Sequence, residues 1–302
     1  MKRGKVLVTG AGGFVGRNLS LGFADLGWGV IGIDRAFDEV WERDDMYCWT
    51  AELSEGIAPG LPEVDLVVHA AWVTTDPTIL GITKAEYMAL NIRPLKAILE
   101  YTARTSPAIF MFMSSSGVFA PTDAPAGLTD SDSPTGTSPY AEAKRIGEAL
   151  VFSALYSETT AHVVRLGHLF GPSEVARPSR LGLSSVAGWL AAAQQGQSIA
   201  VRSDDPLRDW TFTSDLAPAL EQLADGPSAG YPVHLASTYV SSDSKFAALI
   251  ASEFPGIELV TVPAEGRVKP PMVPSDIPVL RDFEWTDPLT GLQTLLTAEV
   301  VA

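Results

Sequence analysis

Residues 6–16 read VLVTGAGGFVG, and this stretch decides the fold. A short apolar strand runs directly into glycines at positions 10, 13 and 16, and a helical pattern begins at once. Glycines at these places permit a tight turn, close approach of backbone N–H groups to a pyrophosphate, and packing of the helix on the strand. The pattern predicts a dinucleotide-binding loop made by Gly10, Gly13, Phe14, Val15 and Gly16.

The rest of the first half alternates short apolar runs with longer helical patterns. Strands are predicted at 5–9, 29–34, 65–69, 109–113 and 162–166, and helices at 14–26, 83–105 and 139–157. Nearly continuous apolar runs are typical of strands buried on both faces, and strand alternating with helix gives a parallel sheet with right-handed crossovers. The sequence therefore predicts an α/β fold, a doubly wound parallel sheet of the Rossmann type.

The second half has shorter elements separated by Pro, Ser and Gly. We predict a first domain over residues 1–170 and a smaller C-terminal domain over 171–302. The apolar run at 231–237 looks like another buried strand, so residues of about 205–240 are predicted to return to the first sheet. Residues 262–278 contain five prolines, which indicates a loop over the surface.

Composition excludes several classes of partner. Twenty-one Lys and Arg against 36 Asp and Glu give a net charge of −15, which argues against nucleic acid and anionic membrane. Cys48 is the only cysteine, so no intramolecular disulfide can form, and its YCWT context predicts packing. Four scattered histidines show no metal-ligand spacing, so no metal is predicted. The first apolar run is too short for a signal peptide or a membrane span, which predicts a soluble cytoplasmic protein.

Asp34 ends the second predicted strand, eighteen residues beyond Gly16. A carboxylate at this place accepts hydrogen bonds from the adenosine ribose of NAD and repels the 2′-phosphate of NADP. A solvated turn aspartate is the alternative, but strand, spacing and residue type together favour NAD. The adjacent Arg35 also belongs to the predicted cofactor site, and its guanidinium leaves NADP open.

Residues 138–144 read SPYAEAK and begin the third predicted helix. Serine suits the N-cap and proline the first turn. Tyr140 and Lys144 lie one turn apart, so their side chains can reach a common target. Taken alone, such a pair is more often a surface feature than a site. An apolar repeat at Ile146, Leu150 and Ala154 predicts the face that packs on the sheet.

Five motifs in order resemble the extended short-chain dehydrogenases/reductases, specifically the NAD-dependent epimerase/dehydratase family. They are TGAGGFVG (9–16), HAA (69–71), MSSSGVF (113–119), YAEAK (140–144) and RLGHLFGP (165–172). The resemblance continues through RDWTFTSDLA (208–217) and covers residues 5 to about 225. It implies NAD as cofactor, a sugar or nucleotide-sugar substrate bound by the smaller domain, and a homodimer.

The resemblance implies a catalytic group of three residues. Tyr140 would exchange a proton with a substrate hydroxyl while hydride moves between the same carbon and nicotinamide. Lys144 would bind the nicotinamide ribose and, with the positive nicotinamide ring, lower the tyrosine pKa from about 10. Ser115, placed by its distance from Val118, would bind the substrate oxygen. Ser114 is expected to cap loop backbone.

Other predicted contacts follow from the same resemblance. Near the cofactor it implies Glu52, Leu53, Ala70, Ala71 and Asn91, the last holding loop backbone. Near the substrate it implies Ser115, Ser116, His168 and Arg208. Arg208 matches an arginine that contacts the diphosphate of nucleotide sugars, although a surface ion pair with Asp205 or Asp209 is equally open. His168 replaces an asparagine and is either an anion donor or a structural histidine.

Departures from the family pattern narrow the reaction. Sugar 4,6-dehydratases carry an Asp-Glu pair where this chain has Ser116 and Gly117, so elimination of water is disfavoured. RDWTFTSD and FGP favour a nucleotide-sugar epimerase. The phrase RLG (165–167) also resembles uronate dehydrogenases and keeps a sugar or sugar-acid dehydrogenase open. A non-catalytic NAD-binding regulator is a third class, disfavoured by the intact tyrosine and lysine. Loops near 72–82, 120–135 and 172–182 are expected to select the substrate.

Overall fold

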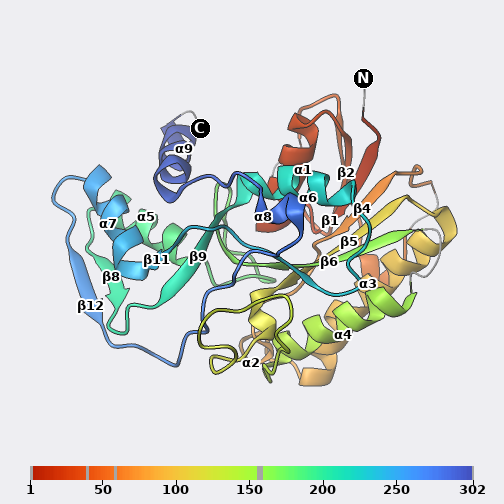
Figure 1. Ribbon diagram of the computed structural model, residues 1–302. Helices are drawn as coiled ribbons and strands as arrows, with labels where there is room; N and C mark the ends of the chain where they lie inside the picture. The colour runs from red at the N-terminus through yellow and green to blue at the C-terminus, as the bar shows by residue number, and fades with distance from the viewer. Residues whose placement is uncertain (1–2, 39–40, 58–59, 155–158, 301–302) are drawn as a thin grey trace.

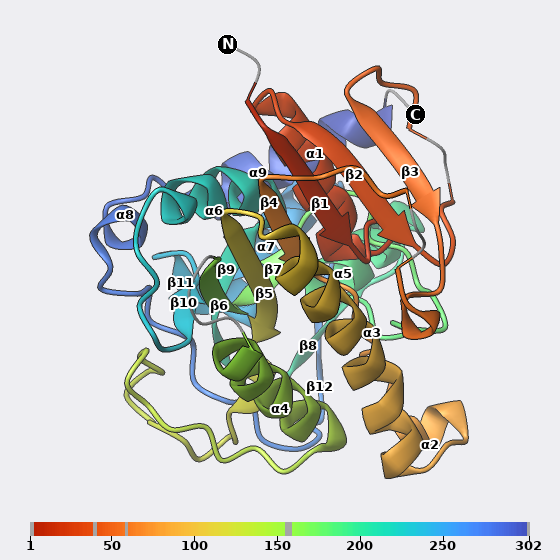
Figure 2. The ribbon, with the colours of Figure 1, turned by 90° about the vertical axis from the view of Figure 1, so that its right-hand side faces the viewer.

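A seven-stranded parallel sheet forms the centre of the protein (Figure 2). The computed structural model describes residues 3–38, 41–57, 60–154 and 159–300. The strand order is β10-β6-β5-β4-β1-β2-β3. The strands are β1 (Lys5–Thr9), β2 (Gly29–Asp34), β3 (Met46–Thr50), β4 (Leu66–His69), β5 (Ile109–Ser115), β6 (Thr160–Leu166) and β10 (Val233–Leu235). The predicted Rossmann sheet is confirmed, and β3 is a strand that the apolar pattern did not predict.

Helices cover both faces of this sheet (Figure 1). One face carries α1 (Phe14–Asp25) and α6 (Leu216–Ala224), and the other carries α3 (Lys84–Thr105) and α4 (Pro139–Ala154). Strand β1 shows why: Val6 and Val8 belong to the core beneath α1 and α6, whereas Leu7 between them belongs to the core beneath α3 and α4. Side chains alternate across a strand, so an all-apolar strand fills both layers.

The chain reverses its direction of winding between β1 and β4, which are neighbours in the sheet. In doubly wound sheets, ligands bind outside the carboxyl ends of the strands at such a switch point. The segments after β1, β2, β3, β4 and β5 line one pocket there. The segment after β3 contains the 3-10 turn η1 (Leu53–Glu55), and the segment after β4 contains the short helix α2 (Pro77–Leu80). This edge of the sheet therefore positions the site.

A second group of elements lies beside the sheet, with its own core (Figure 1). Its strands are β7 (His168–Phe170), β8 (Ile199–Arg202), β9 (Leu207–Phe212), β11 (Val240–Ser242) and β12 (Leu259–Val262). Its helices are α5 (Ser185–Gln194), α7 (Asp243–Glu253) and α9 (Pro288–Val300), while α8 (Pro278–Arg281) contacts α6. Aromatic rings of Trp189, Trp210 and Phe246 pack together at its centre. Strand β10 pairs with β6, as the 231–237 pattern predicts, and the domain boundaries stay a prediction.

Helix α4 turns a different face to the sheet from the one predicted. Its buried side chains include Ala141, Lys144 and Glu148, whereas Ile146 is 44% exposed. Ala154 is also exposed, and only Leu150 of the predicted repeat packs against the core, so the repeat is wrong as the main packing face. The two charged side chains are buried because each has a polar partner inside the protein, as described below. Residues 155–157 of the predicted helix lie outside the described ranges.

The proline-rich segment 262–278 is more than the surface loop that was predicted. Met272 and Ser275 are almost completely buried. The Met272 N–H donates to Asp209 Oδ1 at 3.0 Å, and the Val273 N–H donates to the Leu128 carbonyl at 2.7 Å. These contacts bring the segment to the edge of the site.

Candidate active site

The glycine loop after β1 leaves no room for side chains. Gly10 has φ +71°, and a methyl group there would lie 2.6 Å from the Ala71 backbone N. At Gly16 a methyl group would lie 2.1 Å from the Gly10 carbonyl oxygen. The Gly13 N–H donates to the same carbonyl at 2.9 Å, and α1 begins at Phe14. The loop thus presents bare backbone and a helix N-terminus, which suits a pyrophosphate.

Asp34, at the end of β2, is fixed beside this loop. Its Oδ2 accepts the Gly12 N–H at 2.9 Å, and its Oδ1 accepts the Arg35 N–H at 2.6 Å. The Arg35 guanidinium lies 3.9 Å from the Glu52 carboxylate. Two carboxylates therefore flank the place where an adenosine ribose would sit. Their negative charges favour ribose hydroxyls over a 2′-phosphate.

Asn91 holds the backbone that follows β4. Its Oδ1 accepts the Val73 N–H at 2.7 Å, and its Nδ2 donates to the Tyr87 carbonyl at 3.2 Å. The amide is buried beneath the loop and acts through Val73, which lines the pocket. At the start of the same loop the Ala70 N–H donates to the Thr9 carbonyl at 3.2 Å, so the loop follows the end of β1.

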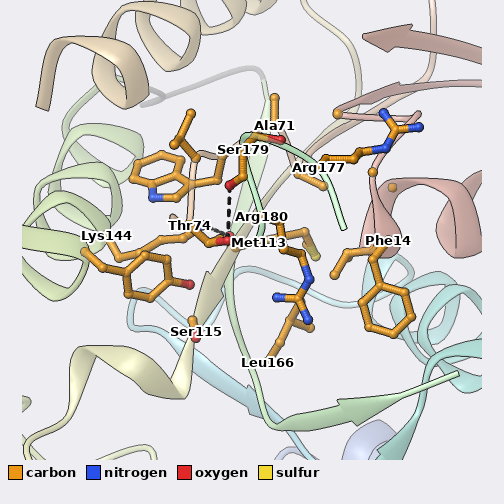
Figure 3. A pocket seen from close by; sticks show the side chains of 18 of the residues that line it. Phe14, Ala71, Thr74, Met113, Ser115, Lys144, Leu166, Arg177, Ser179 and Arg180 are labelled. Atoms are coloured by element: carbon orange, nitrogen blue, oxygen red, sulfur yellow. Dashed lines mark hydrogen bonds between the residues drawn. The ribbon is translucent and has the colours of Figure 1, made fainter. Parts of the chain in front are cut away.

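Ser115, Tyr140 and Lys144 come together at the ends of β5 and α4, and Figure 3 shows the serine and the lysine. Ser115 Oγ accepts the Gly117 N–H at 3.0 Å. A methyl group at Gly117 would lie 2.7 Å from Tyr140 Cε1, so only glycine lets the tyrosine ring approach the serine. Ser138 caps the helix through the Ala141 N–H at 3.1 Å. A Ser–Tyr–Lys group is thus held on rigid elements.

Lys144 lies in an aromatic environment that the sequence did not suggest. Its Nζ donates to the Met113 carbonyl at 2.6 Å and lies 4.0 Å from the ring centroid of Trp72 and 4.9 Å from that of Phe112. Burial lowers the lysine pKa to about 7, against the opposing effect of Glu148. The aromatic faces attract the ammonium and partly offset its loss of water.

The chain's own groups leave the Tyr140 phenol hard to ionise. Burial raises the pKa of Tyr140, while the hydrogen bond with Ser115 and the charge of Arg180 lower it, and Glu148 raises it further. The net direction is upward. The lowering that the family resemblance implies would therefore require positive charge beyond that of the residues at the site, which a bound nicotinamide ring would supply.

A buried ionic network is centred on Glu148, one helical turn after Lys144 on α4. Arg165 of β6 donates to both Glu148 carboxylate oxygens, each at 2.9 Å, and Ser114 Oγ donates to Glu148 Oε1 at 2.6 Å. The expectation that Ser114 caps loop backbone is wrong, because its hydroxyl bonds this carboxylate. The network joins β5, α4 and β6 and fixes the helix face that carries Lys144.

Positive charge gathers at the other end of the pocket. Lys269, from the proline-rich segment, lines the pocket together with Arg180 and His168. His168 Nε2 is buried and has no hydrogen-bond partner among the described residues. Burial lowers the pKa of His168 well below its usual value, and Arg208, Lys269 and Arg180 lower it further. The imidazole is therefore neutral, and the surrounding cations favour an anionic ligand.

Arg208 is engaged by a carboxylate that the sequence did not single out. Its Nε and Nη2 donate to the two oxygens of Asp243 at 2.6 and 3.1 Å. Asp209 accepts the N–H groups of His168 and Met272, and Asp205 accepts the Ser244 N–H at 2.7 Å, so neither is the ion-pair partner considered above. Arg208 lies behind the pocket wall and affects His168 through its charge.

One cavity of about 450 Å³ collects the predicted site residues. Every predicted residue lines it except Asn91 and Arg208. The pocket also contains Trp72, Arg177, Arg180 and Lys269, which sequence reasoning did not name. Trp72, Arg177 and Arg180 lie in loops that were expected to select the substrate, whereas nothing in the sequence pointed to Lys269.

Among the described residues, no helix is both long and apolar enough to cross a bilayer. Within the same ranges, His, Cys, Asp and Glu side chains form no group of three that could hold a metal ion.

A Rossmann sheet, a glycine loop, an acidic residue after β2 and a Ser–Tyr–Lys group define an enzyme of the extended short-chain dehydrogenase/reductase class. The family model "NAD dependent epimerase/dehydratase family" matches residues 6–235, and the chain belongs to that family. NAD is therefore its cofactor, and the bare glycine backbone and Asp34 fit it.

Similar proteins span nearly the whole chain. "Uncharacterized UDP-glucose epimerase YtcB" of Bacillus subtilis (strain 168) is 26% identical over 98% of this chain and 96% of its own length. An epimerase structure from Methanothermobacter thermautotrophicus superposes with a TM-score of 0.82 at 22% identity, over 99% of this chain and 93% of that one. A UDP-glucose 4-epimerase structure from Thermotoga maritima, crystallised with UDP-glucose, gives 0.81 at 17% identity, over 99% and 100%. These two likenesses establish the shared fold.

Proposed function

We propose that the protein is a nucleotide-sugar epimerase that uses NAD. The observation that carries this proposal is the end of the pocket where Lys269 and the neutral His168 lie, beyond the catalytic group. A nucleotide sugar brings a diphosphate to that end when its sugar ring lies at Tyr140. The names of the Bacillus and Thermotoga relatives, both UDP-glucose epimerases, support the same substrate class.

The residues of this chain would divide the work at the sugar carbon. Ser115 holds the reacting oxygen by a hydrogen bond, and Tyr140 takes the proton from the hydroxyl and later returns it. Lys144 Nζ lies 6.0 Å from the centroid of the Tyr140 ring and, when protonated, would supply positive charge there. NAD, when bound, would supply the acceptor and donor for a hydride at that carbon. Return of the hydride to the other face of the same carbon, and of the proton to its oxygen, inverts the carbon with no net redox change.

Elimination of water is disfavoured by the residues after Ser115. Ser116 and Gly117 form the 3-10 turn η2 (Ser116–Val118), and no carboxylate stands at these two positions to remove a second proton. The proposed reaction is therefore confined to oxidation and reduction at one hydroxyl carbon.

A sugar-acid dehydrogenase is the second candidate, because Lys269 also fits a carboxylate. His168 stands where epimerases of the family have asparagine, and its unpartnered Nε2 could bond a carboxylate oxygen. In that reaction the oxidised sugar acid is released, and the NADH that has formed must be exchanged for NAD before the next turnover.

One experiment separates the two candidates. The protein is incubated with NAD and a panel of UDP-sugars and free sugar acids, while NADH absorbance and product identity are followed. The proposal expects interconversion of UDP-sugars without accumulation of NADH. Accumulation of NADH with a free sugar acid, and no change in any UDP-sugar, would contradict it.

We further propose that residues 171–302 outside the central sheet bind the substrate, and that the protein is a cytoplasmic homodimer. Ile146 on α4 is 44% exposed and lies outside the pocket lining, and an apolar side chain on this surface supports pairing of α4 between two copies. Light scattering coupled to gel filtration tests the dimer, and a monomer that persists at high concentration excludes it.

A further inference from the structure

Residues 172–184, here called the crossing segment, run from the end of β7 to the start of α5. Figure 3 shows Arg177, Ser179 and Arg180 of this segment among the residues that line the pocket. On one side the Ser179 carbonyl accepts the N–H groups of Thr74 and Thr75 at 2.8 and 3.1 Å. Arg177 and Arg180 exchange backbone hydrogen bonds of 3.0 and 2.8 Å within the segment. This short bridge sets the directions of the two guanidinium groups.

Arg177 closes the adenosine end of the groove. Its Nη1 donates to the Ala36 carbonyl at 3.3 Å, and its Nη2 pairs with the Asp38 carboxylate. A methyl group at Gly12 would lie 3.1 Å from Arg177 Nη1 and 3.2 Å from Asp34 Oδ2. The arginine thus reaches across the glycine loop to the acidic residue assigned to the ribose.

Arg180 points at the other end of the glycine loop. Its guanidinium carbon lies 5.3 Å from the centroid of the Phe14 ring, at the first residue of α1. Glu174, which is 2% exposed, pairs with Arg180 Nη2 and is itself held by the Ser184 N–H at 2.9 Å. Arg180 Nε is buried and has no hydrogen-bond partner among the described residues. Glu174 fixes the position of the guanidinium, and the buried Nε–H of Arg180 is left to donate. This N–H suits a hydrogen bond to a phosphate oxygen.

We infer that the crossing segment is a clasp for NAD, in which Arg180 bonds the pyrophosphate and the Arg177–Asp38 pair closes the adenosine end. The glycine loop offers backbone N–H groups to the pyrophosphate from below, and Arg180 offers a cation from above. Because the segment crosses the groove, NAD leaves only when the Arg177 contacts open. The clasp concerns binding of the cofactor, so it can be tested independently of the proposed nucleotide-sugar substrate.

The pyrophosphate contact is tested by calorimetric titration of the Arg180→Gln protein with NAD, AMP and UDP. Loss of a charged hydrogen bond should weaken NAD about ten- to hundredfold. AMP, which lacks the second phosphate, and UDP should bind as in the unchanged protein. Arg281→Gln, which removes an exposed cation paired with its neighbour Asp282, is the control and should change none of the three.

Two results of this titration would overturn the assignment. If Arg180→Gln weakens UDP and leaves NAD unchanged, the arginine serves the substrate. If all three ligands bind as before, Arg180 serves only its pair with Glu174.

The closing role of Arg177 is tested through its partner Asp38, which lies outside the pocket lining. Asp38→Asn breaks the ion pair but removes a negative charge near the cofactor. A clasp predicts faster release of NADH, about two- to fivefold for a surface pair, in a fluorescence chase with excess NAD. If Asp38 acted only through its long-range charge, removing that charge would slow the release of NADH. Release of NADH at an unchanged or slower rate would therefore refute the clasp.

Discussion

The two walls of the pocket are built in different ways. The cofactor wall comes from the ends of β1, β2, β4 and β5, where Gly10 and Asp34 occupy places that strand and turn geometry determine locally. The opposite wall depends on contacts between distant residues: Asp209 accepts N–H groups of His168, 41 positions away, and Met272, 63 positions away. Backbone geometry therefore defines one wall, and long-range side-chain contacts define the other.

The largest effect is expected where the two walls meet, at Tyr140. Tyr140→Phe removes the proton-transfer group but keeps the ring that packs beside Gly117. Turnover should fall by about 10²- to 10⁴-fold, as for loss of a general acid or base. NAD affinity, followed by quenching of tryptophan fluorescence, should stay within about twofold, because a hydroxyl at the wall junction adds little to cofactor binding. Turnover near that of the unchanged protein would remove Tyr140 from the catalytic role.

A matched glycine pair tests the difference between the walls. Gly10→Ala forces a side chain into φ +71° and against Ala71, so strain of about 1–3 kcal/mol should weaken NAD by up to about a hundredfold. Gly182→Ala, in the opposite wall, has no atom within 4 Å of the added methyl group and should bind NAD normally. Calorimetric titration of both proteins gives the comparison, and equal losses would show that the walls do not differ in this respect.

A substitution at Asp34 tests whether the cofactor wall selects NAD over NADP. Asp34→Asn keeps an acceptor for the Gly12 N–H but loses the negative charge at the ribose. NAD should bind about tenfold more weakly, and the preference for NAD over NADP should narrow. Binding of both cofactors is measured under the same salt conditions. An unchanged ratio of the two dissociation constants would show that Asp34 does not select NAD.

The pH dependence of stability tests how Lys144 is buried. Its folded-state pKa of about 7 lies below the usual 10.5, so between these values the unfolded chain binds one more proton. The free energy of unfolding should therefore rise with pH across this window, by at most about 1.4 kcal/mol per pH unit. Denaturant unfolding of the unchanged protein and of Lys144→Met, between pH 7 and 10, isolates this contribution as the difference of slopes.

Lys245→Met is the control for that measurement, because Lys245 is exposed and should leave the slope unchanged. Equal slopes in the unchanged protein and in Lys144→Met would mean that the buried lysine keeps an ordinary pKa.

The same contrast explains how far the sequence could be interpreted. The positions of the glycine loop and Asp34 could be predicted because each depends on neighbours within one strand and turn. The Tyr–Lys pair was singled out only through the resemblance of five motifs along the chain, and its catalytic role stays a prediction. Lys269 could not, because nothing near it in the sequence shows that its segment reaches the pocket. Trp72 and Arg180 fell within or beside loops whose conformations depend on long-range contacts.

Helix α4 shows why a local pattern can mislead. Its apolar repeat pointed to Ile146, yet Lys144 and Glu148 face the sheet. Arg165 supplies the charge that allows Glu148 to be buried, and Arg165 lies on a strand 17 residues further along. A pattern within the helix contains no information about that partner.

The most direct test of the proposed epimerisation follows a deuterium label on the reacting carbon of a UDP-sugar in the presence of excess NAD. The account predicts that the label reappears on the sugar of the inverted product and that the NADH in solution stays unlabelled. Labelled NADH in solution together with an oxidised sugar would contradict it.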